Sequence, residues 1–274
     1  MTPERIATLP RPLAFVLPGG GALGAYQVGV LQALATAGVQ PDLLVGVSAG
    51  SVNAALYAWN PGMQGLARME QMWRGITRRD LMRIRFGRMA LAVAGRHPSF
   101  LDNMDGHRFL RRHLGARLLQ HAPTRVALVA TDLLTGEAVA LTEGDAAQAV
   151  LASSAFPGVF PPVEIDGRSL VDGGVVADIP LDLTLQLGAA TALVLSVPWL
   201  AATKVPRHAL DILFRASSLG VEAHGRTVLR RPPPGLVVVE VPAPETDITT
   251  FDVGRSVHML DEGRARAGEW LASD

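Results

Sequence analysis

Short apolar runs and longer helical patterns alternate over the first sixty residues. Leu13–Leu17 is a continuous apolar run, which is typical of a strand buried on both faces. Residues 22–37 then carry apolar side chains at helical spacing, and the pattern stops at Gly38. The same pair follows again, with Leu43–Val47 as a strand and Ala49–Trp59 as a helix. This alternation predicts parallel βαβ units.

The remainder of the chain continues the mixed pattern. Residues 125–131 and 137–141 predict strands, and Asp166 with Gly167 predicts the turn of a hairpin between Val163–Ile165 and 168–171. Two continuous apolar runs, residues 192–197 and 236–241, predict strands buried on both faces. Two further segments, residues 206–229 and 253–271, predict helices.

Composition narrows the class of protein. The 274 residues are 49% hydrophobic and 18% charged, which fits one α/β domain with a substantial core. Cysteine is absent, which excludes thiol nucleophiles, disulfide scaffolds and cysteine-bound metals. The 25 basic residues balance the 25 acidic ones, so we expect no nucleic-acid partner. The first residues do not resemble a signal peptide, and the longest apolar stretch, 189–202, contains Pro198 and is shorter than the ~20 residues of a spanning helix. We therefore expect a cytoplasmic protein that meets a membrane only at its surface.

The balanced total hides a segregation of charge. Lys204 is the only lysine, and twelve of the 24 arginines fall between Arg68 and Arg117, against four acidic residues. Residues 66–117 are helical in tendency and are predicted to form an arginine-rich cap or insert within a single domain of residues 1–274. Such a face is either a solvated helical surface or a contact for anionic lipid headgroups.

The first candidate for chemistry is the glycine-rich segment 19–24, between a predicted strand and a predicted helix. Amides at such a turn suit either a bound phosphate or a developing oxyanion. A dinucleotide-binding loop has the same setting, and Asp42 follows at a distance that suits a ribose-binding acid. A plain tight turn is the third interpretation of this segment.

The second candidate is Gly46-Val-Ser48-Ala-Gly50, a G-x-S-x-G sequence between a predicted strand and a predicted helix. This setting is the nucleophile elbow, in which a sharp turn exposes the serine hydroxyl above the sheet. A serine nucleophile needs a base. None of the seven histidines lies in a glycine-supported loop after a strand, so a Ser–His–Asp triad is poorly supported; they are His97, His107, His113, His121, His208, His224 and His258.

The third candidate is Asp172, which ends a predicted strand and precedes Gly173 and Gly174. Taken in order, the glycine loop, the G-x-S-x-G serine and the D-G-G aspartate resemble the patatin-like phospholipase family. The resemblance extends to residues 130–136 and 152–162 and covers roughly residues 13–200. One position departs from the family pattern, because Leu23 stands where a basic residue is usual.

The resemblance implies a mechanism and its residues. Ser48 would be the nucleophile, Asp172 its base without an intervening histidine, and the amides of Gly19, Gly20 and Gly21 the oxyanion hole. The substrate would be a lipid acyl ester, whether of phospholipase, lysophospholipase or esterase type, and no cofactor or metal is implied. Residues 152–162, which have no evident chemistry, would border the acyl channel.

Fold and function expectations follow from both lines of argument. We expect a three-layer α/β/α sandwich around a mostly parallel sheet, with the site at the carboxyl ends of the strands. A non-catalytic lipid-binding or regulatory module on the same fold is the main alternative. A dinucleotide-binding oxidoreductase is a weaker one, because it leaves Ser48 and Asp172 unexplained.

Overall fold

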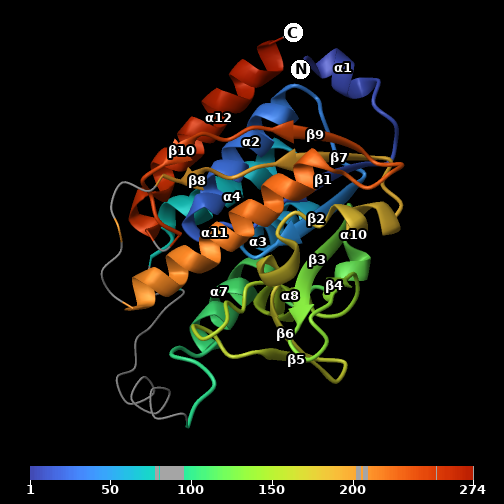
Figure 1. The fold of residues 1–274 in the computed structure, drawn as a ribbon. Helices are drawn as coiled ribbons and strands as arrows, with labels where there is room; N and C mark the ends of the chain where they lie inside the picture. Colours follow the sequence, from blue (N-terminus) through green and yellow to red (C-terminus); the bar gives the residue numbers. More distant parts are fainter. Residues whose placement is uncertain (78–79, 81–95, 202–204, 206–208, 251, 274) are drawn as a thin grey trace.

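A computed structural model of the chain describes all residues except 78–79, 81–95, 202–204, 206–208, 251 and 274. Its centre is an eight-stranded sheet with the strand order β5-β6-β3-β2-β1-β7-β9, and β4 also pairs with β3 (Figure 1). Strands β3, β2, β1, β7 and β9 are mutually parallel, whereas β4 and β6 run antiparallel to β3. The strand bounds are β1 Leu13–Leu17, β2 Leu43–Val47, β3 Arg125–Asp132, β4 Ala138–Leu141, β5 Val163–Ile165, β6 Arg168–Asp172, β7 Thr191–Leu195 and β9 Val237–Val241.

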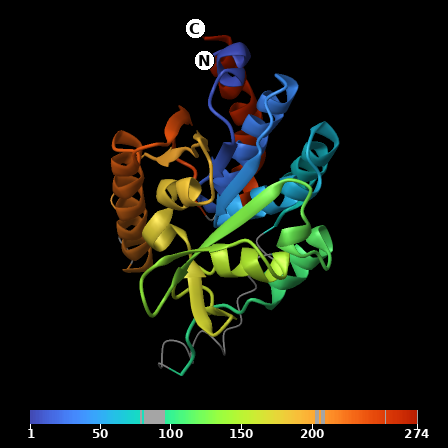
Figure 2. The same ribbon diagram turned by 90° about the vertical axis from the view of Figure 1, so that its right-hand side faces the viewer.

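Helices cover both faces of this sheet, as the three-layer prediction requires. One face carries α2, α3, α4, α7, α8 and α12, and the other carries α9, α10 and α11 (Figure 2). The bounds of these helices are α2 Gly24–Thr36, α3 Ala49–Trp59, α4 Met63–Gly75, α7 Met104–Leu114, α8 Ala146–Ser153, α9 Gly174–Ala177, α10 Leu181–Gln186, α11 Ala209–Arg230 and α12 Ser256–Ala272.

The central strands divide their side chains between the two layers. Phe15 of β1 packs in the larger cluster, beneath α2 and α3, while its neighbours Ala14 and Val16 pack in the smaller cluster with Leu181 of α10. Successive side chains of a strand point to opposite faces, so a run of apolar residues is what a strand covered on both sides needs. The continuous apolar patterns of β1, β2 and β7 are thereby explained.

The short elements lie around this framework. Helix α1, Pro3–Ala7, lies near the carboxyl terminus, where the amino group of Met1 donates to the carbonyl of Trp270 at 3.1 Å. Strands β8, Trp199–Leu200, and β10, Glu245–Thr246, form a separate parallel pair. Three 3₁₀ turns complete the order: η1 Gly21–Leu23, η2 Leu119–His121 and η3 Val253–Arg255. In the described part of the chain, no helix is long and apolar enough to cross a membrane.

Most predicted elements are present, with three differences. The strand at 236–241 was predicted to be buried on both faces, and this is wrong, because β9 is the edge of the sheet and Val237 is 39% exposed. The pattern at 22–37 begins as the 3₁₀ turn η1 before α2. The sequence patterns do not predict helices α1, α8, α9 and α10 or the short strands β8 and β10. The arginine-rich segment is described only at its ends, as α4 and α7, and its middle lies outside the described residues.

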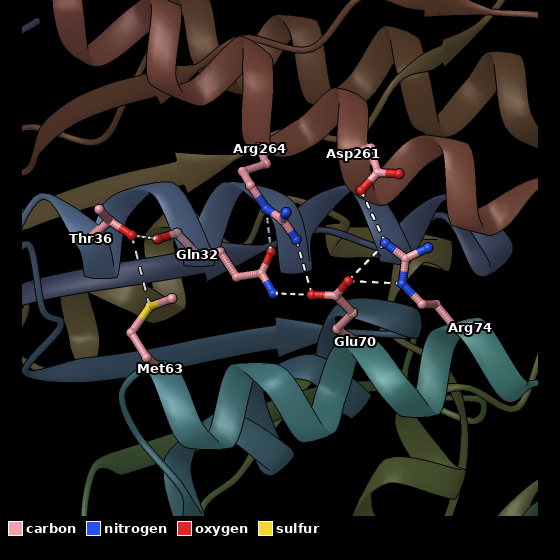
Figure 3. Close-up of polar contacts among 7 residues, drawn as sticks. All are labelled: Gln32, Thr36, Met63, Glu70, Arg74, Asp261 and Arg264. Carbon is pink, nitrogen blue, oxygen red and sulfur yellow. Dashed lines mark hydrogen bonds and ion pairs between the residues drawn. The ribbon is translucent and has the colours of Figure 1, made fainter.

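A polar cluster joins three helices of the larger layer and is shown in Figure 3. Glu70 of α4 accepts from Gln32 of α2 at 2.7 Å and from Arg74 at 2.8 Å. Arg264 of α12 reaches both Glu70, at 3.0 Å, and Gln32, at 2.8 Å, and Arg74 also pairs with Asp261 of α12. These residues, called the Glu70 cluster below, hold α2, α4 and α12 together.

Candidate active site

Ser48 lies on a sharp turn between β2 and α3, as the G-x-S-x-G pattern predicts. Its φ of 50° and ψ of −121° place a non-glycine residue in a sparsely populated backbone conformation. Gly50 makes the turn possible, because a methyl group there would lie 2.0 Å from the carbonyl oxygen of Leu17. The hydroxyl of Ser48 thus stands at the carboxyl end of β2 and at the amino end of α3, where the helix dipole favours negative charge.

Two serines at the end of α8 hold this turn. The amide of Ser48 donates to the hydroxyl oxygen of Ser153 at 3.0 Å, and the hydroxyl of Ser153 donates to the carbonyl of Val129 at 2.6 Å. The hydroxyl of Ser154 donates to the carbonyl of Ser48 at 3.2 Å. The sequence assigned no chemistry to residues 152–162, and the missed signal is the pair of hydroxyls in an otherwise apolar stretch.

Asp172 ends β6 beside Ser48 and is almost entirely buried, at 5% exposure. Its carboxyl is within hydrogen-bonding reach of the Ser48 hydroxyl and accepts from the amide of Gly174 at 2.8 Å. Burial raises the pKa of Asp172 to about 7, even though both hydrogen bonds favour the charged form. A carboxyl with this pKa is poised to exchange a proton near neutral pH.

A second buried carboxyl, which sequence reasoning missed, lies next to the first. Asp178 follows α9 and is also 5% exposed. It accepts from the amide of Gly19 at 2.8 Å, and burial raises its pKa to about 6. The N–H of Gly19, expected from the sequence to be an oxyanion donor, is therefore directed to Asp178 in this structure.

The other two glycines of the loop line the same cavity as Ser48. Gly21 has a φ of 57°, and a methyl group there would meet the carbonyl of Thr250 at 2.3 Å, so only glycine fits this position. Among the described residues, the amides of Gly20 and Gly21 have no acceptor. Leu23, which replaces the family's usual basic residue, is buried and lines the cavity with a neutral side chain.

The cavity at Ser48 has a volume of about 1160 Å³, above the roughly 300–1,000 Å³ of ordinary ligand pockets. One wall is apolar and comes from α4, α7, α8 and the segment after it, including Met72, Trp73, Phe109, Leu110, Leu151 and Phe160. The opposite wall is mixed, with Val197, Trp199 and Val221 beside Arg215, Glu222 and Asp247. The arrangement suits a ligand with a long apolar part.

Other candidate groups lie elsewhere. Among the described residues, no histidine lines the cavity, and no group of three or more histidine and acidic side chains is arranged to hold a metal. Asp42 precedes β2, at the opposite end of the strands from the glycine loop, and pairs with Arg11 at 2.7 Å. It is therefore not placed to bind a ribose at that loop, which removes the basis of the dinucleotide interpretation.

A model of the patatin-like phospholipase family matches residues 15–185, more than half of the chain. The chain belongs to this family. The match spans the glycine loop, Ser48, Asp172 and Asp178. The family resemblance found in the three sequence motifs is confirmed.

Relatives within the family are mostly larger proteins. An uncharacterized NTE family protein of Mycobacterium tuberculosis is 32% identical over 172 residues, which are 62% of this chain and 44% of the relative. A lysophospholipase, NTE1 of Phaeosphaeria nodorum, is 28% identical over 187 residues, which are 65% of this chain and 11% of the relative. The chain thus spans less than half the length of these curated patatin-like relatives.

A solved structure confirms the fold at greater distance. ExoU, from the type III secretion system of Pseudomonas aeruginosa and crystallised with SpcU, aligns with a TM-score of 0.50 and 16% identity. The alignment covers 96% of this chain and 53% of ExoU. At this identity the likeness concerns the patatin-like fold alone.

Proposed function

We propose that the protein is a serine hydrolase of lipid acyl esters that works with a Ser48–Asp172 dyad. The observation that carries the proposal is the burial of Asp172 beside a strained Ser48 at the base of an apolar cavity. Membership of the patatin-like phospholipase family supports the reaction class, and a lysophospholipase among the relatives supports a lipid substrate.

The proposed reaction has two halves. Asp172 in its ionised form accepts the hydroxyl proton of Ser48 while the serine oxygen bonds to the ester carbonyl carbon. The tetrahedral intermediate collapses when the ester C–O bond breaks and Asp172 returns the proton to the leaving alcohol. Water then gives a proton to Asp172 while its oxygen bonds to the acyl carbon. The bond between that carbon and Oγ of Ser48 breaks, Asp172 returns the proton to Oγ, and the fatty acid is released.

The oxyanion of each intermediate is assigned to the amides of Gly20 and Gly21. They lie at the cavity without an acceptor among the described residues, whereas the amide of Gly19 is held by Asp178. One such donor contributes ~3–4 kcal/mol to the stability of the transition state. The sequence predicted three oxyanion donors, the amides of Gly19, Gly20 and Gly21, and the proposal retains the last two.

The decisive experiment uses a fluorophosphonate probe and a soluble acyl ester on the purified chain. Ser48→Ala should lose both labelling and hydrolysis, while Ser169→Ala, which alters the β5–β6 hairpin, should keep both. Absence of labelling in the folded wild type would refute the hydrolase and favour a lipid-binding module on this fold.

We also propose that the segment from Arg68 to Arg117 faces anionic lipid. Its described ends, α4 and α7, border the cavity, so a lipid contact there would bring the cavity to the membrane surface. Among the described residues of the segment, three arginines are paired within the protein: Arg74 with Glu70, Arg108 with Asp105, and Arg111 with Asp145. The number of arginines free to contact lipid is accordingly smaller than the twelve that the sequence places between Arg68 and Arg117.

Vesicle binding tests the lipid contact separately from the chemistry. Binding should rise with the fraction of anionic lipid and weaken with salt, because exposed charges are screened over ~8–10 Å at moderate ionic strength. Hydrolysis of a short soluble ester should respond little to the same salt. If vesicle binding does not depend on the fraction of anionic lipid, the arginines form a solvated surface and not a lipid contact.

A further inference from the structure

Asp178 is a buried acid to which the dyad mechanism gives no role. Its carboxyl is 5% exposed and accepts the Gly19 amide at 2.8 Å. In the described part of the chain, no arginine, lysine or histidine pairs with it or with Asp172. An unpaired carboxyl in such a place is costly to the fold, so its position calls for a reason beyond stability.

The geometry places Asp178 between the glycine loop and the dyad. A methyl group on Gly19 would lie 2.8 Å from Oδ1 of Asp178 and 3.1 Å from Cβ of Ser48. A methyl group on Gly174 would lie 3.2 Å from Oδ1 of Asp172 and 3.4 Å from Oδ1 of Asp178. The carboxyl groups of Asp172 and Asp178 therefore lie close to the same position beside Gly174. The hydrogen bond from Gly19 to Asp178 holds the glycine loop next to Ser48.

We propose that Asp178 is a positioning residue of the hydrolase, which holds the Gly19 amide so that the next two amides face the oxyanion and sets a second negative charge beside Asp172. The inference rests on the proposed function of Ser48 and Asp172. Asp178 touches neither substrate nor reacting atoms. It acts through Gly19 on one side and through Asp172 on the other.

The second part of this role is electrostatic. Burial is the main reason why the pKa of Asp172 is raised, and the nearby charge of Asp178 raises it further. Among the described residues, Asp172 of β6 is the titratable group that faces Asp178. Other charged side chains at the cavity are Arg215 and Glu222 of α11 and Asp247. Removing the charge of Asp178 while keeping its oxygen should therefore lower the pKa of Asp172.

Three variants separate anchoring from charge. Asp178→Ala removes both, Asp178→Asn keeps an oxygen that can accept from Gly19, and Asp182→Ala is the control at an exposed acid of α10. We expect Asp178→Ala to lower kcat by about 10²-fold with little change in KM, because misplaced donors weaken only the transition state. Asp178→Asn should recover most of that kcat at pH 8.

The pH profile gives a readout that a merely structural role would not move. In Asp178→Asn the acid limb of kcat/KM should shift to lower pH relative to wild type, whereas Asp182→Ala should leave it in place. A wild-type kcat in Asp178→Ala would overturn the anchoring role. An unshifted acid limb in Asp178→Asn would overturn the electrostatic role.

A measurement without turnover separates this inference from the proposed function. In protein labelled with [¹⁵N]glycine, the amide signal of Gly19 should titrate near pH 6, where the buried Asp178 loses its proton, and should not do so in Asp178→Asn. If wild type hydrolyses no ester but this titration is seen, the hydrolase proposal fails and the anchor stands. If the Gly19 signal does not titrate in active wild type, the anchor fails alone.

Discussion

The two buried acids of the cavity and Glu70 show opposite ways of placing a carboxyl group in this fold. Asp172 and Asp178 lie side by side, each 5% exposed, with only hydrogen bonds to favour their charge. Glu70 is less buried, with a side chain 22% exposed, and lies between Arg74 and Arg264 (Figure 3).

The pKa values follow from this difference. For Asp172 and Asp178, burial outweighs the hydrogen bonds and raises the pKa to about 7 and about 6. For Glu70, burial alone would raise the pKa, but hydrogen bonds from Gln32 and Arg74, with the charge of Arg264, outweigh it and lower the pKa. The carboxyl that joins helices is thus kept ionised, whereas the two buried carboxyls of the cavity have pKa values near neutral pH, at a cost in stability when they are ionised.

Asp172→Asn should have the largest effect on turnover and should differ most from Glu70→Gln. We expect kcat/KM for a soluble ester to fall on the order of 10³-fold or more, because the variant has no base for Ser48. Glu70→Gln should stay within about twofold of wild type. Steady-state kinetics and circular dichroism on both variants measure this. Near-normal turnover in Asp172→Asn would break the dyad and require a different base.

The pH dependence of hydrolysis should report the acid in the cavity. Because Asp172 must be ionised to accept a proton, kcat/KM should rise about tenfold per pH unit on the acid side and level off above a midpoint near 7. Glu70→Gln should keep that midpoint. A profile that is flat from pH 5 to pH 8 would show that Asp172 is not the group that limits the reaction.

Stability should depend on pH with opposite signs at the two sites. The folded-state pKa of Asp172 lies above its unfolded value, so wild type loses free energy of unfolding as the pH rises from about 4 to about 7. Asp172→Asn removes this loss, and we expect it to be more stable than wild type by on the order of 2–4 kcal/mol at pH 8, with little difference at pH 4. Urea unfolding measures both. An equal difference at the two pH values would contradict the raised pKa.

Glu70→Gln should give the smallest effect, in the reverse direction. The lowered pKa of Glu70 means that its charge stabilises the fold above pH 4.5 and that this contribution is lost as the pH falls through the folded-state value. We expect a loss of ~1–2 kcal/mol at pH 7 that shrinks at lower pH. Glu143→Gln, at an exposed glutamate, is the matched control and should change little. A loss at pH 7 no larger than the control's would mean that the Glu70 cluster adds nothing to stability.

Local patterns were enough to predict the framework. The apolar runs of β1, β2 and β7 are buried on both faces, and Asp166 with Gly167 forms the predicted hairpin turn, both with positive φ. The predicted burial of β9 on both faces is wrong, because an apolar sequence does not distinguish a strand inside the sheet from one at its edge. Strand order is fixed by pairing between distant segments, which periodicity does not encode.

The βα framework could be predicted from apolar periodicity, and the elbow at Ser48 from the G-x-S-x-G pattern, because few residues fit so tight a turn. The pairing of Ser48 with Asp172 came from the resemblance of three motifs to a family. The hydrogen bonds by which Ser153 and Ser154 hold the elbow, and by which Asp178 binds the Gly19 amide, depend on tertiary packing and were visible in no motif. It also decided that neither buried acid meets a cation among the described residues. Burial and distance to other charges set the pKa of an acid, and both arise only when segments more than a hundred residues apart pack together.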